Sequence, residues 1–369
     1  MTHKYLPLFV EPSYSSSPWF KETLAGIEDE ASRHKIEVKT FIESIEQVDI
    51  HALPSVVTLA SRSRSYLNAM IDHMENHSKK SILAGVDSGY FGENISSATV
   101  SRTAETIRLI SYMYSCGRSK IALFGLDQIS NNDMVRYSAV FNAASNYDFH
   151  IEPEDVYFNN GSLSECFDLF MERSSQYNAV ICPNDIVAIC FMQFARNKGI
   201  RVPEDIFVGS FGNFHCSRLC NPSLTTFSID FYEIGVQIVN SWIFLMENPH
   251  IASMKITTPS KLIIRESTAS LEENNYVHRV FEQPAQADRY YQDPLLSKAF
   301  DIENCMSLRD ALDMKIINGI MQHKVYEHIS EELFISTSAL RYRVSKMYQD
   351  ARVDNKTEFI KLLEQYLFW

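Results

Sequence analysis

The residues best suited to chemistry lie near the C-terminus, where cations and hydroxyl groups recur at helical spacing. Between Thr337 and Lys356 the chain carries five Lys or Arg and two Asp, a local net charge of +3, against −12 for the whole sequence. If the apolar residues of this segment face inward, the polar ones share the opposite face. We expect that face to contact DNA bases and phosphates through Ser338, Arg341, Tyr342, Arg343, Ser345 and Lys346.

Four short amphipathic helices are predicted to position this face. Their apolar residues are Leu312, Ile316, Ile317 and Ile320, then Val325, Ile329 and Leu333, then Leu340, Val344 and Met347, and last Phe359, Leu362, Leu363, Tyr366 and Leu367. Residues 334–337 allow only a tight turn, and Ser336 is the predicted N-cap of the third helix. Any small helical bundle has exposed cations, so a bundle that docks a protein partner is the alternative.

The run ELFISTSALRYRVSKMYQDARVDNKTEFIKLL resembles the C-terminal DNA-binding domain of LuxR-type response regulators. The resemblance covers the last sixty residues or so and implies a helix, an FIS turn, a recognition helix, a V-x-N-K-T-E connector and a dimerisation helix. Arg341 stands where that family usually has Lys, and Arg343 where it often has His. His323 and Arg352 stand where it usually has Gly, at positions where a left-handed backbone favours glycine.

A second group of polar and aromatic residues follows predicted strands in the first 270 residues. Aromatic rings for stacking, an arginine and several amide or carboxylate groups suit a small hydroxylated ligand such as a sugar. The expected ligand-binding residues are Ser15, Ser17, Trp19, Phe20, Arg62, Asp87, Arg136, Asn184, Asp185 and Asn213. Each also has a simpler interpretation: Asn184 and Asp185 could cap a helix, and Trp19 could belong to the core.

Short apolar runs alternate with longer amphipathic ones over this region, which predicts an α/β fold with parallel sheets. Strands are predicted at 6–10, 55–59, 81–86, 120–124, 179–182 and 206–210, and helices at 19–33, 101–114, 135–146, 163–173, 186–198 and 232–247. Ligands of such folds bind beyond the carboxyl ends of the strands.

Several segments here resemble the effector domain of lactose-repressor-type regulators, which share the two-lobed fold of periplasmic sugar-binding proteins. They are SSPWFKETLAGIEDEA, YSCGRSKIALFG, ICPNDIVAICFMQFARNKGIRVPEDIFVGSFGN, NPSLTTFSID and LIIREST. The resemblance implies two lobes joined by three crossings, a ligand cleft between them and a side-by-side homodimer. It also places ligand contacts at residues 15–20, Asp87, Arg136 and Asn184. Gly212 and Ile229 depart from the family, which usually has Asp and a polar residue there.

We therefore expect a ligand-sensing domain at 1–269, a linker at 270–304 and a helix-turn-helix DNA-binding domain at 305–369. The lactose-repressor family normally begins with its own helix-turn-helix, whereas here a receptor strand begins by Tyr5 and the DNA-binding segment stands at the other end. The linker contains Tyr276, Phe281, Tyr290, Tyr291 and Phe300, which favours partial order against a neighbouring part. Seven cysteines without a CxxC spacing and no apolar run of membrane length indicate a cytoplasmic protein.

The sequence lacks the GxGxxG, GxxxxGK[ST], GxSxG and HExxH motifs of common enzyme classes. His73 and His77 have helical metal-ligand spacing, but their neighbours DHMENHSKK favour a solvated surface. Asp87 and Asp185 are not paired as glycosidase carboxylates would be. Glu11 alone after the first strand does not make a phosphoacceptor site. We expect no catalytic residue, cofactor or metal, and a homodimeric transcription regulator that binds a small molecule and DNA.

Overall fold

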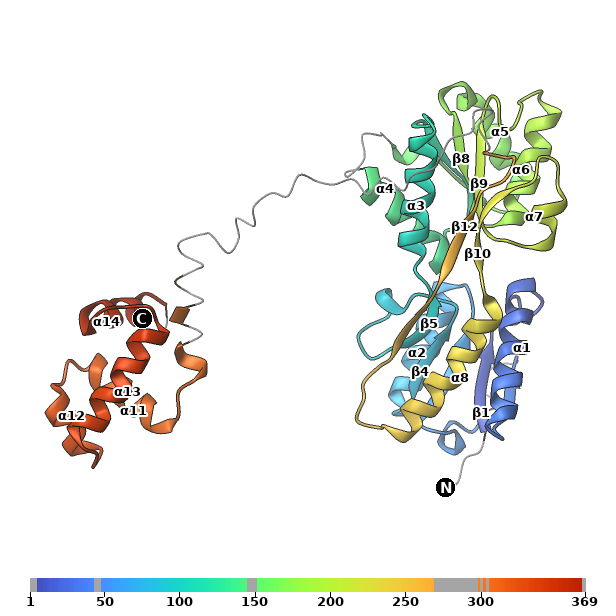
Figure 1. The fold of residues 1–369 in the computed structure, drawn as a ribbon. Helices are drawn as coiled ribbons and strands as arrows, with labels where there is room; N and C mark the ends of the chain where they lie inside the picture. Colours follow the sequence, from blue (N-terminus) through green and yellow to red (C-terminus); the bar gives the residue numbers. More distant parts are fainter. Residues whose placement is uncertain are drawn as a thin grey trace. The chain divides into compact units, whose positions relative to one another are not determined.

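The computed structural model describes residues 5–42, 48–144, 151–268, 298, 301–302 and 305–366. The chain divides into two compact units, Met1–His278 and Arg279–Trp369. The first is a two-lobed α/β domain and the second is a small all-α unit (Figure 1). This confirms the predicted fold class. The expected linker, apart from Lys298, Asp301 and Ile302, lies outside the described residues.

Lobe 1 is built on a six-stranded sheet of order β11-β5-β4-β3-β1-β2, in which every neighbouring pair is parallel. Its strands are β1 (Tyr5–Val10), β2 (Glu37–Phe41), β3 (Val56–Ala60), β4 (Lys80–Ala84), β5 (Ser96–Val100) and β11 (Lys255–Thr258). Helices α1 (Pro18–Arg33) and α8 (Phe231–Glu247) pack on one face and α2 (Arg64–Asn76) on the other. Because both faces are covered, the central strands β3 and β5 are buried along their whole length.

Lobe 2 has a second six-stranded sheet of order β12-β10-β9-β8-β6-β7, parallel except for the β10–β12 pair. Its strands are β6 (Ile121–Leu126), β7 (Val156–Phe158), β8 (Ala179–Ile181), β9 (Phe207–Gly212), β10 (Thr225–Ile229) and β12 (Ser260–Ile263). Residues of α3 (Arg102–Ser115) and α4 (Asn131–Ala144) pack on one face. Residues of α5 (Leu163–Arg173) and α6 (Asp185–Asn197) pack on the other, and α7 (His215–Leu219) follows β9.

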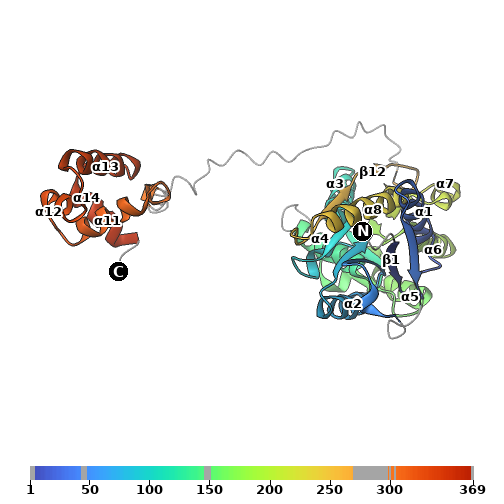
Figure 2. The same cartoon turned by 90° about the horizontal axis from the view of Figure 1, so that it is seen from below.

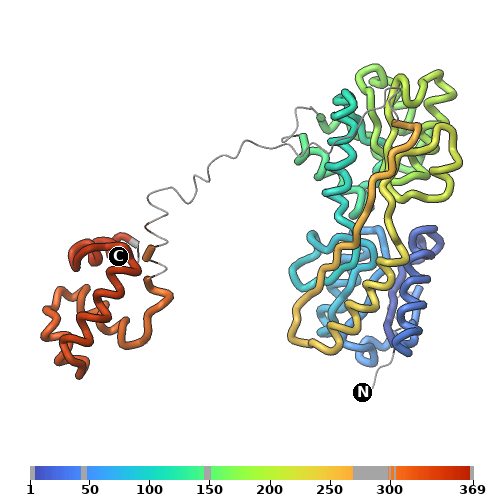
Figure 3. Tube along the Cα trace, in the orientation of Figure 1, coloured from blue at the N-terminus to red at the C-terminus, as the bar shows by residue number. Residues whose placement is uncertain are grey.

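The chain passes between the lobes three times, as the path of the tube in Figure 3 shows. The crossings run from β5 to α3, from β10 to α8, and from β11 to β12. Residues 101, 230 and 259 therefore lie between elements of different lobes. Side chains next to these crossings would change their contacts if one lobe moved relative to the other.

Helices α1 and α8 lie side by side in lobe 1 (Figure 2). A Cβ atom at Gly26 would lie 2.0 Å from the backbone oxygen of Tyr232, and one at Gly235 would lie 2.1 Å from that of Thr23. The two glycines thus allow backbone-to-backbone packing that no larger residue permits.

The second unit consists of α11 (Ala311–Met321), α12 (Tyr326–Glu332), α13 (Thr337–Asp350) and α14 (Lys356–Tyr366). The four predicted helices are confirmed, as is the cap: the Ser336 hydroxyl accepts a hydrogen bond from the Ala339 amide at 3.2 Å. Phe359, Leu362 and Leu363 are buried in the unit's own core, where Phe359 packs on Tyr348 at 5.2 Å between ring centroids. These three side chains of the last helix therefore do not form an exposed apolar surface.

The six predicted strands correspond to β1, β3, β4, β6, β8 and β9, and the six predicted helices to α1, α3, α4, α5, α6 and α8. The missed strands include SSATV of β5 and TTFSI of β10, which are rich in Ser and Thr. Their side chains are buried, and the β10 hydroxyl of Thr226 donates to Asp185 at 2.6 Å. A hydropathy pattern does not show strands whose hydroxyls are satisfied by distant partners.

Candidate functional site

A cavity of about 90 Å³ lies between the two lobes, next to the crossings at residues 101 and 230. Lobe 1 and its crossings contribute Tyr14, Trp19, Thr23, Arg62, Gly85, Arg102 and Phe231, and lobe 2 contributes Ser130, Asn132, Asp133, Arg136, Pro183, Asn184, Phe211, Phe214 and Ile229. Most of these residues follow the carboxyl ends of strands, which is where ligands of open parallel sheets bind. Sites for drug-sized ligands usually enclose about 300–1,000 Å³, so the free space between these side chains is small.

Arg136 forms one buried corner of the cavity, with 5% of its surface exposed. Its guanidinium donates to the carboxylate of Asp133 at 3.3 Å and lies 4.3 Å above the ring of Phe211. Burial lowers the pKa of Arg136 and raises that of Asp133, because removal from water penalises the charged form of each. The Asp133 carboxylate also accepts a hydrogen bond from the amide of Asp127.

Arg102 begins α3 at the first crossing and is 4% exposed. Its guanidinium donates to the hydroxyl of Thr99 and, at 2.8 Å, to the carbonyl oxygen of Gly85. Both acceptors are neutral. Burial, and next the neighbouring cation of Arg136, lower the pKa of Arg102 to about 10, so it still carries its proton at neutral pH. A buried guanidinium held only by neutral groups is costly in an apo cavity.

Aromatic rings form the opposite part of the lining. The rings of Trp19 and Phe214 lie 5.9 Å apart, and Phe214 and Phe231 are stacked with centroids 6.0 Å apart and planes 9° from parallel. Gly212 makes this packing possible, because a Cβ atom there would lie 2.9 Å from the Phe214 ring. The departure from Asp at position 212 thus leaves room for an aromatic wall instead of a carboxylate.

Three buried polar atoms of the cavity lining have no hydrogen-bond partner: Nε of Arg102, Nε of Arg136 and Oδ1 of Asn132. The Asn132 amide nitrogen donates to Gly85 at 3.1 Å, which orients the side chain and leaves its oxygen free. Buried polar atoms are nearly always satisfied in folded proteins, and exceptions mark missing water, ions or ligands. The two Nε donors and the Oδ1 acceptor could therefore form hydrogen bonds with a ligand.

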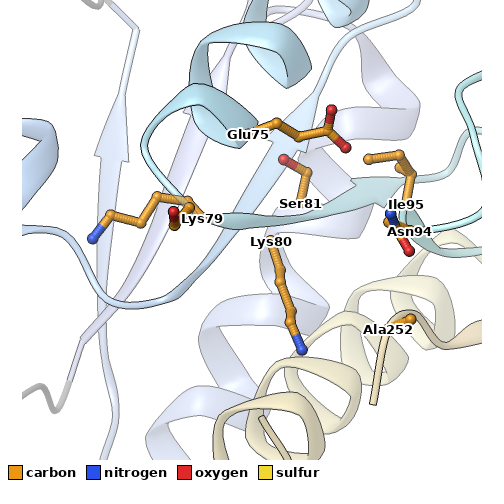
Figure 4. Close-up of a pocket in the computed structure, with 8 residues that line it drawn as sticks. Glu75, Lys79, Lys80, Ser81, Asn94, Ile95 and Ala252 are labelled. Atoms are coloured by element: carbon orange, nitrogen blue, oxygen red, sulfur yellow. The ribbon is translucent and has the colours of Figure 1, made fainter. Parts of the chain in front are cut away.

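A second, larger cavity of about 360 Å³ opens at the other edge of the lobe 1 sheet, where β4 begins (Figure 4). Its two lysines are already used: Lys79 donates to the carbonyl of Leu53 at 2.6 Å and Lys80 to that of Pro249 at 2.7 Å. These contacts hold loops of lobe 1 together. This larger cavity lies at the amino ends of the strands, whereas ligands of such sheets bind at the carboxyl ends. We therefore regard the smaller interlobe cavity as the candidate ligand site.

In the helical unit, α13 buries Leu340, Val344 and Met347 as predicted. The opposite face exposes Ser338, Arg341, Tyr342, Ser345 and Lys346. Arg341 makes an exposed ion pair with Glu327 of α12 at 3.0 Å. Arg343 is different: its guanidinium contacts Asp310 at 2.9 Å and Asp313 at 2.7 Å, and so joins α13 to the start of α11.

The expected left-handed positions are present without glycine. His323 after α11 has φ +57° and Arg352 after α13 has φ +52°, while Phe334 in the turn between α12 and α13 has φ +55°. The backbone turns typical of glycine caps are thus kept at some conformational cost.

Comparison with known proteins places these features in context. Residues 110–268 match the family described as periplasmic binding protein-like domain. The HTH-type transcriptional repressor CytR of Escherichia coli is 25% identical over 273 residues, 69% of this chain and 76% of the relative. The repressor PurR of Histophilus somni is 25% identical over 189 residues, 50% of this chain and 57% of the relative.

Two solved structures share the fold. A putative LacI transcriptional regulator from Bacillus cereus subsp. cytotoxis has a TM-score of 0.65 at 18% identity, covering 73% of this chain and 100% of the other. The CelR regulator in its cellobiose complex has a TM-score of 0.62 at 15% identity, covering 72% of this chain and 84% of the other.

The two-lobed domain thus shares its fold with these regulators. The named relatives are transcriptional repressors, which agrees with the expectation of a transcription regulator rather than an enzyme. Of the ten residues expected at the ligand site of the effector domain, four line the cavity: Trp19, Arg62, Arg136 and Asn184. Arg62 pairs there with Asp127, and Asn184 also caps α6 by accepting from the Val187 amide at 3.0 Å.

The other six lie outside the lining of the effector-domain cavity. Ser15 and Ser17 donate to nearby carbonyl oxygens, and Phe20 packs against Tyr14 in the core. Asp87 accepts from the amide of Gly89 at 2.8 Å. The remaining two, Asp185 and Asn213, are occupied by internal hydrogen bonds.

Sequence reasoning missed most of the aromatic wall, together with Arg102, Asn132 and Asp133. Arg102 carried a usable signal, because it begins a helix directly after a strand, as Arg136 nearly does. That signal was hidden because the strand SSATV itself was not recognised.

The histidines singled out by spacing do lie together: the rings of His73 and His77 are 4.8 Å apart, and His51 is 5.4 Å from His77. His77 Nδ1 bonds to the carbonyl of His73 at 2.8 Å. Among the described residues, no three His, Cys, Asp or Glu side chains are arranged to hold a metal ion. Within the same residues, no helix is long and apolar enough to cross a membrane.

Proposed function

We propose that this protein is a cytoplasmic transcription regulator whose effector domain binds a small molecule between its lobes and whose C-terminal helical unit binds DNA in the manner of LuxR-type domains. The observation that carries the proposal is the exposed face of α13. It presents Arg341, Tyr342, Ser345 and Lys346 beyond a tight turn capped by Ser336. That is the form in which a helix-turn-helix offers its second helix to a major groove.

Local charge supports DNA over a protein partner. Although the whole chain has a net charge of −12, the segment that includes α13 is positive. The acids nearest this face are partners of its arginines, with Glu327 on Arg341 and Asp313 on Arg343. Phosphate binding would exchange the exposed Glu327–Arg341 pair for a phosphate contact, whereas the half-buried Arg343 contacts would stay.

The experiment is an electrophoretic shift assay of the full chain on fragments of its own upstream DNA, with Arg341→Ala and the matched exposed cation variant Lys315→Ala. A base contact by Arg341 costs about 1–3 kcal/mol when removed, which is roughly 5- to 150-fold in affinity. Lys315 lies on α11 and its variant should bind as the parent does. Binding should also weaken steeply with salt. If no fragment is retained specifically, or if both variants behave alike, the helical unit has another role, such as docking a protein.

For the effector we propose a compact hydroxylated molecule, a sugar or sugar derivative. Support comes from the aromatic rings of Trp19, Phe214 and Phe231, against which a sugar ring can pack, and from the polar groups of Arg136 and Asn184 in the same lining. Thermal-shift screening of a sugar library should raise the melting temperature of the parent but not of Arg136→Met. Equal responses from both proteins would place the binding site elsewhere.

We also propose that the working unit is a homodimer formed by the effector domains, which would present two α13 helices to DNA. Adjacent major grooves on one side of DNA lie about 34–36 Å apart, so two linked units can bind where one binds weakly. Sedimentation of the full chain with and without operator DNA tests this. A monomer under both conditions would remove the dimer from the proposal.

A further inference from the structure

We infer that the effector carries an anionic group, a carboxylate or a phosphate, and that Arg102 binds this group beside Arg136. The inference rests on the proposed function, because it assigns the chemical class of the ligand that the interlobe cavity would hold. It goes beyond a neutral sugar, because a neutral ligand would leave the buried guanidinium of Arg102 without a negative partner.

The charged residues of the cavity lining favour an anion. Three arginines, Arg62, Arg102 and Arg136, and one acid, Asp133, line the cavity. Arg62 is paired with Asp127 behind it, and Arg136 is paired with Asp133. Among the described residues no carboxylate lies within ion-pair distance of Arg102, so its charge is the one not matched by direct contact.

Hydrogen bonds hold the Arg102 side chain in one orientation. The Thr99 hydroxyl and the Gly85 carbonyl fix the two Nη atoms and therefore the plane of the guanidinium. Nε remains buried without an acceptor. An Arg fork has five N–H groups and is suited to planar carboxylate or phosphate oxygens. The donor is thus oriented before any ligand arrives, which limits the entropy lost on binding.

The buried carboxylate of Glu105 does not serve as the ion-pair partner of Arg102. Glu105 lies one helical turn after Arg102 on α3 and is 1% exposed, yet neither of its oxygens accepts a well-formed hydrogen bond. Burial raises the pKa of Glu105, against smaller opposing effects of Arg136, Arg102 and the Ser260 hydroxyl. Glu105 does not line the cavity, so its carboxylate does not occupy the position of a ligand there.

Other groups of the cavity lining indicate what the rest of the ligand contains. Asn132 offers an unsatisfied oxygen, which accepts from a ligand hydroxyl. The stacked rings of Phe214 and Phe231 offer an apolar face for a ring. An anion at Arg102 and Arg136, a hydroxyl at Asn132 and a ring against the aromatic wall together describe a hydroxylated acid or a phosphorylated sugar.

The test compares matched ligands on the full chain by thermal shift and titration calorimetry. Each set contains a neutral sugar, its uronic or aldonic acid and its phosphate ester, with inorganic phosphate and acetate as minimal probes. The variants are Arg102→Met, Arg102→Lys, and Arg108→Met as the control, because Arg108 is an exposed arginine on the same helix. Circular dichroism verifies that each variant is folded.

We expect at least one anionic ligand to bind the parent and Arg108→Met tenfold or more tightly than its neutral counterpart. Arg102→Met should lose that preference, and Arg102→Lys, which keeps the charge without the fork, should recover part of it. The acid and phosphate arms decide which anion is preferred. The inference is overturned if a neutral sugar binds as tightly as its acid and its phosphate, if Arg102→Met keeps the preference, or if no anionic probe stabilises the parent more than Arg102→Met. If a neutral ligand controls DNA binding, the proposed regulator function stands and only the proposal of an anionic effector is rejected.

Discussion

The guanidinium of Arg343 lies 2.7 Å from the carboxylate of Asp313 and so joins α13 to the first turn of α11. Asp313 and Asp310 also form the capping box of α11, in which each accepts from the other's amide. The residue expected to read DNA therefore supports the bundle that presents the reading helix. Burial and pairing separate it from Arg341, two positions earlier on the same helix.

Replacement of Arg343 by Ala should therefore lower stability more than it alters DNA specificity. The ion pairs are partly exposed, so we expect a loss of about 1 kcal/mol, or roughly 4–8 °C in the melting temperature of a unit this small. Differential scanning calorimetry of Arg343→Ala and Lys346→Ala tests this, since Lys346 is exposed on the same helix. An unchanged melting temperature for Arg343→Ala would show that its pairs do not hold the bundle.

Replacement of Gly26 by Ala should destabilise lobe 1, because the new methyl group would meet the Tyr232 backbone at 2.0 Å and force α1 away from α8. Overpacking of this kind costs about 1–3 kcal/mol. Urea unfolding measures the loss, with Glu28→Ala on the exposed face of α1 as the control. A stability within about 0.5 kcal/mol of the parent would mean that the helices separate without penalty.

Asp185 is fully buried and accepts from the Ser210 hydroxyl at 2.5 Å, the Thr226 hydroxyl at 2.6 Å and the Phe214 amide at 2.7 Å. Asp185→Ala would leave the buried hydroxyls of Ser210 and Thr226 and the part-buried amide of Phe214 without this acceptor, at about 1–3 kcal/mol for each buried group left unsatisfied. We expect a severe loss of stability in chemical unfolding, and a smaller one for Asp185→Asn, which keeps one acceptor oxygen. Parent-like stability of the alanine variant would show that these three hydrogen bonds do not hold the lobe together.

The buried carboxylate of Glu105 predicts a pH effect. Burial raises its pKa in the folded protein above the ordinary value of 4.5, so the folded state binds this proton more tightly than the unfolded state. At a pH above the raised pKa, ionised Glu105 lowers the free energy of unfolding. This destabilisation disappears as the pH falls towards 4.5.

Glu105→Gln should accordingly raise the free energy of unfolding at about pH 8 and have little effect at about pH 4.5. Denaturant unfolding at several pH values, with the exposed control Glu28→Gln, gives the comparison. A variant effect that does not change with pH would indicate a steric rather than an electrostatic cause.

The sequence by itself determined the elements with a strong local signal. The apolar strands such as 6–10 and 120–124, the amphipathic helices and the Ser336 cap depend on neighbours within a few residues, so their pattern is readable along the chain. The closed turns at His323 and Arg352 followed from the resemblance of the surrounding segment, and the structure adopts them without glycine.

Only the tertiary structure decided which polar residues face the cavity. Phe20 and Asp185 have the same residue types and strand-end positions as true lining residues, yet packing buries one in the core and internal hydroxyls occupy the other. Arg102 escaped notice because its environment is formed by Gly85 and Arg136, which are distant in sequence and meet it only where the chain crosses between lobes. Local spacing carries no information on such meetings, because they depend on how the two sheets are joined.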